Sequence, residues 1–308
     1  LIVPNYFFRR DDNGNLTSGS GCGNDVASER PMVRKFIVDS VKYWANEYNM
    51  DGFRFDLMGL MDIKTINEIT TALNKIDPTI LVIGEGWNMG TLPANQRANQ
   101  LNIQKLNRVS HFNDQIRDGV KGSVFDSADT GFATGKPGSR NDVMAGIVGN
   151  VDYSTSISTK WVTSYPGQSV NYVESHDNMT LVDKIKASVK DAKPSDIAQL
   201  SQFSTSIAFL SQGLPFMQAG QEFLRSKNGD TNSYKSSDAI NSIKWDTRKS
   251  NISTVNYYKG LIALRKNYSA FRMTTTAQVK SNLKFSDSPE GTIVYTLNGA
   301  AVKDKAAT

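Results

Sequence analysis

Cysteine is nearly absent from this chain of 308 residues, since Cys22 is the only one. A single thiol excludes a disulfide within the chain and a metal site built from several thiolates. No apolar run approaches the roughly 20 residues that a membrane-spanning helix needs. Lys and Arg give a net charge of +5, yet they form no dense basic run, so neither nucleic acid nor a membrane is an expected partner.

The bulk composition is that of a globular protein. With 39% hydrophobic residues, a chain of this length has room for one large domain and the start of another. The first residues, Leu1 to Pro4, contain neither a Met nor a basic leader. We therefore expect the chain to begin within a longer protein.

Strand and helix patterns alternate five times along most of the chain. Pro31 opens the first helical pattern, and Asp62 is the expected N-cap of the second. The expected strands are 52–56, 79–84, 109–112, 169–174 and 214–218, and the expected helices include 31–49, 63–76, 142–148, 194–210 and 251–266. The alternation predicts an α/β fold with a parallel sheet, which either a barrel or an open sheet would satisfy.

The pattern changes after about Met273. Two strand-like segments, 278–285 and 292–297, are separated by a turn that contains Pro289 and Gly291. We expect 1–272 to form the β/α domain and 273–308 to form the beginning of a separate β-sandwich domain.

The strand expected at 52–56 carries charge where a buried strand should be apolar. In an extended segment Arg54 and Asp56 point to one face, while Phe53 and Phe55 point to the other. The charged face is either a structural ion pair or part of a functional site.

Two further acids have the same position relative to their expected strands. The carboxyl ends of parallel strands meet at one edge, where β/α folds assemble their sites. Three acids share that position: Asp56, Glu85 and Asp177. Arg54, Trp87 and His176 accompany them.

Retaining glycoside hydrolysis requires such a set, with a nucleophilic carboxylate and a protonated carboxyl roughly 5 Å apart. Asp56 beside Arg54 is expected to stay ionised. Glu85 stands between glycines and before Trp87, and a crowded apolar setting there would raise its pKa and suit it to proton donation. His176 and Asp177 would then hydrogen-bond sugar hydroxyls, and Trp87 would offer a face to a sugar ring.

A divalent-cation site is the competing interpretation, because three carboxylates and a histidine can also bind a metal. Arg54 argues against it, since a guanidinium beside a ligand opposes cation binding. The other histidine, His111, is interpreted as a structural residue at a strand end.

Three short motifs in order resemble the α-amylase superfamily, glycoside hydrolase family 13: 52–56 (GFRFD), 84–87 (GEGW) and 173–178 (VESHDN). Longer stretches resemble its type I pullulanases more closely: 18–24, 27–34, 112–119 and 220–223. The resemblance covers nearly the whole chain.

The resemblance implies a TIM-type barrel in which Asp56 is the nucleophile, Glu85 the general acid/base and Asp177 the transition-state stabiliser. It implies that Arg54 and His176 bind substrate in subsites. Trp87 and Asn178 would lie near the scissile bond. The implied substrate is a branched α-glucan such as pullulan, amylopectin, glycogen or a limit dextrin, cut at α-1,6 links.

One motif of that superfamily is missing. Its first motif, on the third barrel strand, contains an Asn-His pair, and neither His111 nor His176 has that setting. We therefore expect barrel strands four to eight here, and expect the chain to need an amino-terminal half. No cofactor is expected, a structural Ca²⁺ stays open, and an extracellular or cell-surface bacterial location is favoured over a cytoplasmic one. A catalytically inert glucan-binding or assembly fragment and a branching-type transglycosidase are the alternatives.

Overall fold

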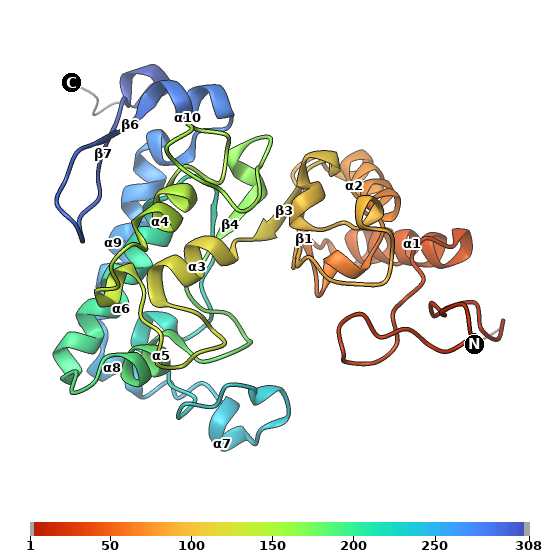
Figure 1. Cartoon of the computed structure of the whole chain (residues 1–308), viewed down its shortest axis with the longest axis horizontal. Coiled ribbons are helices and arrows are strands. Elements are labelled where there is room, and N and C mark those ends of the chain that lie inside the picture. Colours follow the sequence, from red (N-terminus) through yellow and green to blue (C-terminus); the bar gives the residue numbers. More distant parts are fainter. Residues whose placement is uncertain (1–2, 305–308) are drawn as a thin grey trace. The chain divides into compact units, whose positions relative to one another are not determined.

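The computed structural model describes residues 3–304, which belong to two compact units (Figure 1). The first unit comprises Leu1–Phe112 and Trp161–Ser164, and the second comprises Asn113–Lys160 and Tyr165–Thr308. None of the helices within 3–304 has the length and apolar character to cross a bilayer.

Three parallel strands form the sheet of the first unit in chain order, namely β1 (Gly52–Phe55), β2 (Leu81–Gly84) and β3 (Val109–Phe112). Phe53 pairs with Val82 between β1 and β2, and Val82 pairs with Val109 between β2 and β3. This register brings the carboxyl ends of the strands to one edge of the sheet.

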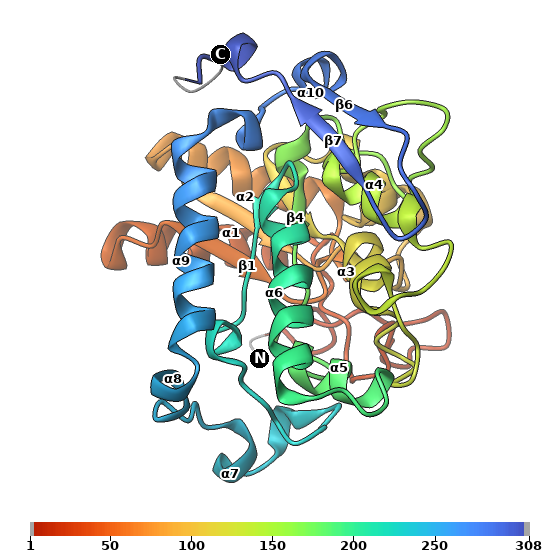
Figure 2. The same ribbon diagram turned by 90° about the vertical axis from the view of Figure 1, so that its left-hand side faces the viewer.

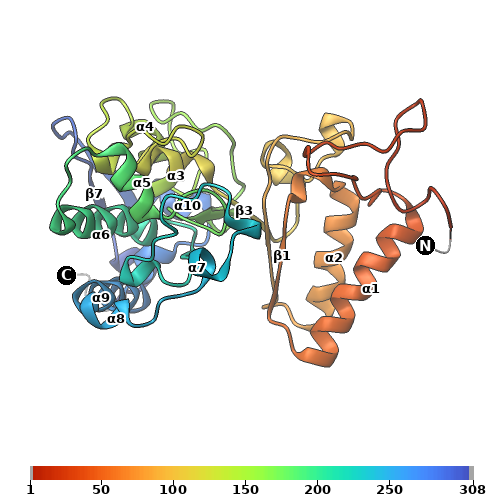
Figure 3. The ribbon, with the colours of Figure 1, turned by 90° about the horizontal axis from the view of Figure 1, so that it is seen from below.

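Two long helices, α1 (Pro31–Tyr48) and α2 (Ile63–Ile76), pack side by side in this unit (Figure 3). The first begins at a proline, whose missing N–H is not needed in the first turn. The apolar stripe of α2 is buried in a core that it shares with α1 and the strands: Val41, Ala45, Met58, Ile66, Ile69, Leu73, Val82 and Val109.

The second unit contains two short parallel strands, β4 (Ser169–Asn171) and β5 (Leu214–Pro215). Its main helices are α3 (Asp114–Lys121), α4 (Arg140–Ile147), α5 (Leu181–Ser188), α6 (Pro194–Leu210) and α9 (Ile252–Asn267). Helices α7 (Asp238–Asn241) and α8 (Thr247–Ser250) are single turns. Helices α6 and α9 pack along each other (Figure 2).

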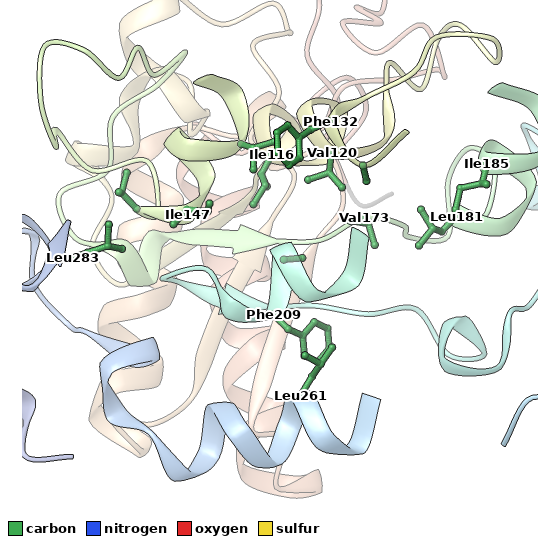
Figure 4. Close-up of a cluster of buried hydrophobic side chains, with 14 of the residues drawn as sticks. Ile116, Val120, Phe132, Ile147, Val173, Leu181, Ile185, Phe209, Leu261 and Leu283 are labelled. Carbon is green, nitrogen blue, oxygen red and sulfur yellow. The ribbon is translucent and has the colours of Figure 1, made fainter. Parts of the chain in front are cut away.

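One apolar core joins helices α3, α4, α5, α6 and α9 (Figure 4). Ile116 and Val120 of α3, Leu181 and Ile185 of α5 and Phe209 of α6 are all buried in it. Burial of side chains of this size stabilises a fold by about 1.5–3 kcal/mol each, so this cluster holds the helices together.

The carboxyl-terminal segment differs from the expectation. Strands β6 (Leu283–Ser286) and β7 (Val294–Leu297) form an antiparallel hairpin, but 276–282 is the helix α10 (Thr276–Asn282). The predicted strand 278–285 is therefore wrong in its first half. Thr275 and Gln278 cap this helix reciprocally, with Gln278 N donating to Thr275 Oγ1 over 3.1 Å. The domain boundary near 272 stays a prediction.

The α/β alternation expected from the sequence is confirmed, with five parallel strands, β1 to β5. Helices α3 and α5 were not expected, and the strand expected at 169–174 ends at Asn171.

A buried carboxylate ties α1 and α2 together. Asp62 caps α2 by accepting from Thr65 N (2.9 Å), and it also accepts from Ser28 Oγ (2.8 Å) and from Arg34 Nη2 (3.2 Å). Burial acts to raise the pKa of Asp62, but these hydrogen bonds and the Arg34 charge outweigh it and lower the pKa below its ordinary value.

We predict that Asp62→Ala lowers the free energy of unfolding by about 3 kcal/mol, because the buried Arg34 loses the nearer of its two carboxylate partners and α2 loses its N-cap. Urea unfolding followed by circular dichroism measures this loss. Asp39→Ala is the matched control, because its ion pair with Lys35 is exposed. It should leave the unfolding midpoint unchanged, and an equal loss in both variants would contradict the role of Asp62.

Candidate active site

Two charged side chains at the end of β1 open the first group of site residues. Phe53 and Phe55 pack against the core, so Arg54 stands on the other face of the strand, and Asp56 follows the last strand residue. Leu57 then adopts a left-handed conformation with φ 47°, which turns the chain sharply out of the strand.

Arg54 joins the carboxylates of two neighbouring strand ends. Its Nη1 donates to Asp56 Oδ1 over 2.6 Å, and its Nη2 donates to Glu85 Oε1 over 2.8 Å. The main-chain N of Leu57 donates to the other Glu85 oxygen over 2.9 Å. A carboxylate oxygen of Asp56 lies within 4.8 Å of one of Glu85. This spacing fits the carboxyl pair of a retaining glycoside hydrolase, roughly 5 Å apart.

Glu85 is buried at 5% exposure, but its surroundings are not the apolar setting expected from the sequence. A guanidinium and a main-chain N–H both contact it, and both stabilise an ionised carboxylate. Arg54 donates to both carboxylates, and its positive charge acts against cation binding there.

The glycines beside Glu85 are required by close packing. A Cβ at Gly84 would lie 2.5 Å from the Cε of Met58, and one at Gly86 would lie 2.5 Å from the ring of His111. Trp87 is half-buried, and its carbonyl oxygen would be 2.2 Å from a Cβ at Gly59. Close contacts therefore restrict the backbone at Gly84 and at Gly86, on either side of Glu85.

His111 on β3 is fully buried behind this backbone. Its Nδ1 lies 3.2 Å from the carbonyl oxygen of Gly84, while its Nε2 has no hydrogen-bond partner among the described residues. Burial lowers the pKa of His111 to about 4, against the opposing hydrogen bond to Gly84. This neutral ring supports the Gly84–Gly86 backbone, as expected of a structural histidine.

The second group of site residues lies in the second unit, on the loop between β4 and α5. His176 Nε2 and Asp177 Oδ1 are 3.4 Å apart, and both side chains are more than half exposed. Asn178 adopts a left-handed conformation with φ 63°. Because β4 ends at Asn171, Asp177 lies well inside the loop and not directly at the strand end.

The structure thus brings the predicted residues together in two groups. Arg54, Asp56 and Glu85 form one in the first unit, followed by Trp87, and His176 and Asp177 form the other in the second unit.

Three buried charged residues of the second unit were not predicted as site residues: Glu174, Lys121 and Lys227. Glu174 is 1% exposed, and burial raises its pKa to about 7. Burial and the Arg117 charge lower the pKa of the buried Lys121 to about 7. Lys227, 4% exposed, donates to the loop of His176 and Asp177. Glu174 stands inside an expected strand, which was a signal, whereas nothing near Lys227 in the sequence marks it.

The sequence is similar to pullulanases along most of its length, although no protein-family model matches it. It is 44% identical to a pullulanase of Bacillus subtilis over 96% of this chain and 41% of the relative. It is also 33% identical to a chloroplastic pullulanase of Arabidopsis thaliana, over 81% of this chain and 31% of the relative. The chain spans less than half the length of these relatives.

Solved structures agree with the sequence comparison. A pullulanase of Paenibacillus barengoltzii in complex with maltotetraose matches 95% of this chain and 45% of its own, with 44% identity and a TM-score of 0.93. A pullulanase of Bacillus acidopullulyticus matches 99% of this chain and 37% of its own, with 43% identity and a TM-score of 0.93. The α/β fold class, a partial barrel followed by a β hairpin, is confirmed by these matches.

The buried His111 makes a pH-dependent contribution to stability. Its pKa is about 4 in the folded chain and about 6.5 when unfolded, so between these values only the unfolded state binds the proton. The contribution is complete above pH 6.5 and is lost as the pH falls towards 4.

We predict that the unfolding free energy falls by about 3 kcal/mol between pH 7 and pH 4 because of His111 alone. Urea unfolding at several pH values should show a smaller slope in His111→Leu than in the parent chain. The matched control is His176→Gln, whose parent ring is more than half exposed. Equal slopes in all three proteins would contradict the prediction.

Proposed function

We propose that this chain, which is homologous to pullulanases over nearly its whole length, is the carboxyl-terminal part of the catalytic barrel of a retaining debranching hydrolase. Its substrates would be branched α-glucans such as pullulan, amylopectin, glycogen or limit dextrins, and the bond cut would be the α-1,6-glucosidic link. The observation that supports this most directly is the pair of carboxylates, Asp56 and Glu85, joined by Arg54.

In the proposed reaction Asp56 attacks the anomeric carbon, while Glu85 gives its proton to the oxygen of the leaving sugar. A covalent glycosyl ester on Asp56 results. Glu85, now ionised, takes a proton from water, and the hydroxyl oxygen displaces Asp56 from the same carbon. The sugar keeps its anomeric configuration because the carbon is inverted twice.

Arg54 has two tasks in this scheme. Its hydrogen bond to Asp56 orients the nucleophile. Its second hydrogen bond goes to Glu85, which must carry a proton before the first step. We infer that substrate binding weakens this contact, because protonation of Glu85 and a salt bridge to Arg54 exclude each other.

The remaining predicted residues would bind the sugars. Asp177 would stabilise the positive charge of the oxocarbenium-like transition state, and His176 beside it would donate to a sugar hydroxyl. Trp87 and Asn178 would contact the substrate near the scissile bond. This scheme uses carboxylates and needs no organic cofactor, while a structural Ca²⁺ and an extracellular or cell-surface location stay predictions.

We further propose that activity requires additional barrel strands from an amino-terminal half. The α1 helix supports this, because large apolar side chains on it are exposed: Met32, Phe36, Tyr43, Trp44 and Tyr48. A chain of this kind without that half would be the inert fragment considered above.

Replacing the nucleophile gives a direct test. We predict that Asp56→Asn lowers pullulan hydrolysis at least about 10⁴-fold, because an amide cannot form the glycosyl ester. The assay measures reducing ends released from pullulan by the full-length polypeptide that carries this chain. Asp51→Asn is the matched control, since Asp51 is an exposed acid just before β1, and it should keep full activity.

The same assay separates the alternatives. Retained activity in Asp56→Asn would remove Asp56 from the nucleophile role. New α-1,6 links without a rise in reducing ends would identify a branching-type transglycosidase. No turnover by the parent protein, with glucan still bound, would identify a non-catalytic binding protein.

A further inference from the structure

The loop between β4 and α5 is fixed at both ends by buried groups. Its part from Ser175 to Thr180 carries His176 and Asp177. At its start, Glu174 Oε2 accepts from the main-chain N of Leu181 over 2.5 Å, which closes the loop across its base. At its end, Thr180 caps α5 by accepting from Asp183 N over 3.2 Å.

A second segment of the chain is docked onto this base. It follows β5 and a 3₁₀ turn (Gln221–Phe223), and it contains Ser226 and Lys227. Ser226 Oγ donates to Asp183 Oδ1 over 2.5 Å, and the main-chain N of Lys227 donates to Asp183 Oδ2 over 2.7 Å. The buried carboxylate of Asp183 therefore sets where the side chain of Lys227 begins.

The ammonium of Lys227 reaches from this anchor to the loop. Its Nζ donates to the carbonyl oxygen of His176 over 3.2 Å and to Ser233 Oγ over 2.7 Å. The carbonyl of His176 belongs to the peptide unit that leads into Asp177, and that unit is planar. A hydrogen bond to this carbonyl therefore restricts the orientation of the backbone on which the Asp177 side chain stands.

Burying the ammonium of Lys227 costs free energy that its contacts must offset. A buried lysine loses hydration, and burial together with the neighbouring Arg225 lowers the pKa of Lys227. Glu174, Asp230 and Asp177 act in the opposite direction and favour the charged form. Apart from these distant acids, its direct partners are a carbonyl and a hydroxyl, neither of which carries a charge.

We propose that Lys227 is a positioning residue for Asp177: its buried ammonium holds the peptide between His176 and Asp177, so that the Asp177 carboxylate is oriented before substrate binds. The effect on catalysis rests on the proposed function, in which Asp177 stabilises the transition state. The effect on the loop does not.

The test compares two buried lysines of the second unit. Lys227→Met removes the contact to the loop, and Lys184→Met is the matched control. Lys184 is 2% exposed, and its Nζ donates to the carbonyl oxygens of Asp126 and Ser127, outside the loop. Both variants lose a buried ammonium, but only one loses a contact to the His176–Asp177 peptide.

Two measurements are made on the full-length polypeptide. In hydrogen exchange, peptides that cover 174–181 should exchange at least about 10-fold faster in Lys227→Met and at the parent rate in Lys184→Met. In pullulan hydrolysis, Lys227→Met should lower kcat about 10- to 100-fold with KM within about 3-fold, because oriented charge acts in the transition state. Lys184→Met should lower the melting temperature and keep kcat.

Equal effects of both variants on exchange and on kcat would overturn the proposal, because they would show a purely structural role. Parent-like exchange in Lys227→Met would overturn it as well. If Lys227→Met does not fold, Lys227→Leu, which also lacks a donor, replaces it and is judged by the same comparison. If the parent protein does not hydrolyse glucans, the proposed function fails, while the exchange comparison still decides the role of Lys227.

Discussion

The first group of site residues depends on the guanidinium of Arg54, which contacts both carboxylates. Two carboxylates within 4.8 Å of each other repel when both are ionised, and one of them, Glu85, is buried. Arg54 offsets that repulsion by donating to both. It can do so only because strand alternation places it beside Asp56 on the face opposite the core, while the parallel register places Glu85 at the next strand end. The geometry of the sheet therefore determines which charged side chains meet in this group.

In the second unit, buried charged side chains fix the loop that carries the site residues. This loop carries exposed charges at His176 and Asp177, and the support comes from below, where Glu174 closes the loop and Lys227 holds a carbonyl. In both units a charged side chain binds main-chain atoms as well as another side chain. Such contacts fix the backbone that carries the reactive group, which a salt bridge between two flexible side chains would not do.

Local signals in the sequence predicted the fold where they were strong. Pro31 and the N-cap Asp62 marked the starts of two helices, and the apolar run before Glu85 marked a strand; all three are confirmed. Helix α10 was missed because alternating polar and apolar residues outweighed the capping pair Thr275 and Gln278. Helix α3 was missed because its N-cap, Asn113, stands directly after a strand. The candidate acids stand out in the sequence because each follows a strand pattern, although β4 itself ends at Asn171, before Asp177. The contacts of Lys227 could not, because they join segments distant in sequence, and no local pattern records such a contact.

The close approach of Gly86 to the His111 ring has a consequence for how this sequence can diverge. No side chain fits at position 86 while an imidazole occupies position 111, since a Cβ would lie 2.5 Å from the ring. A smaller residue at 111 would open that space but would remove the support behind Glu85. Position 86 can therefore take a side chain only after the ring at position 111 has been lost. Descendants of this sequence would cross that step through an intermediate with a cavity next to their proposed proton donor.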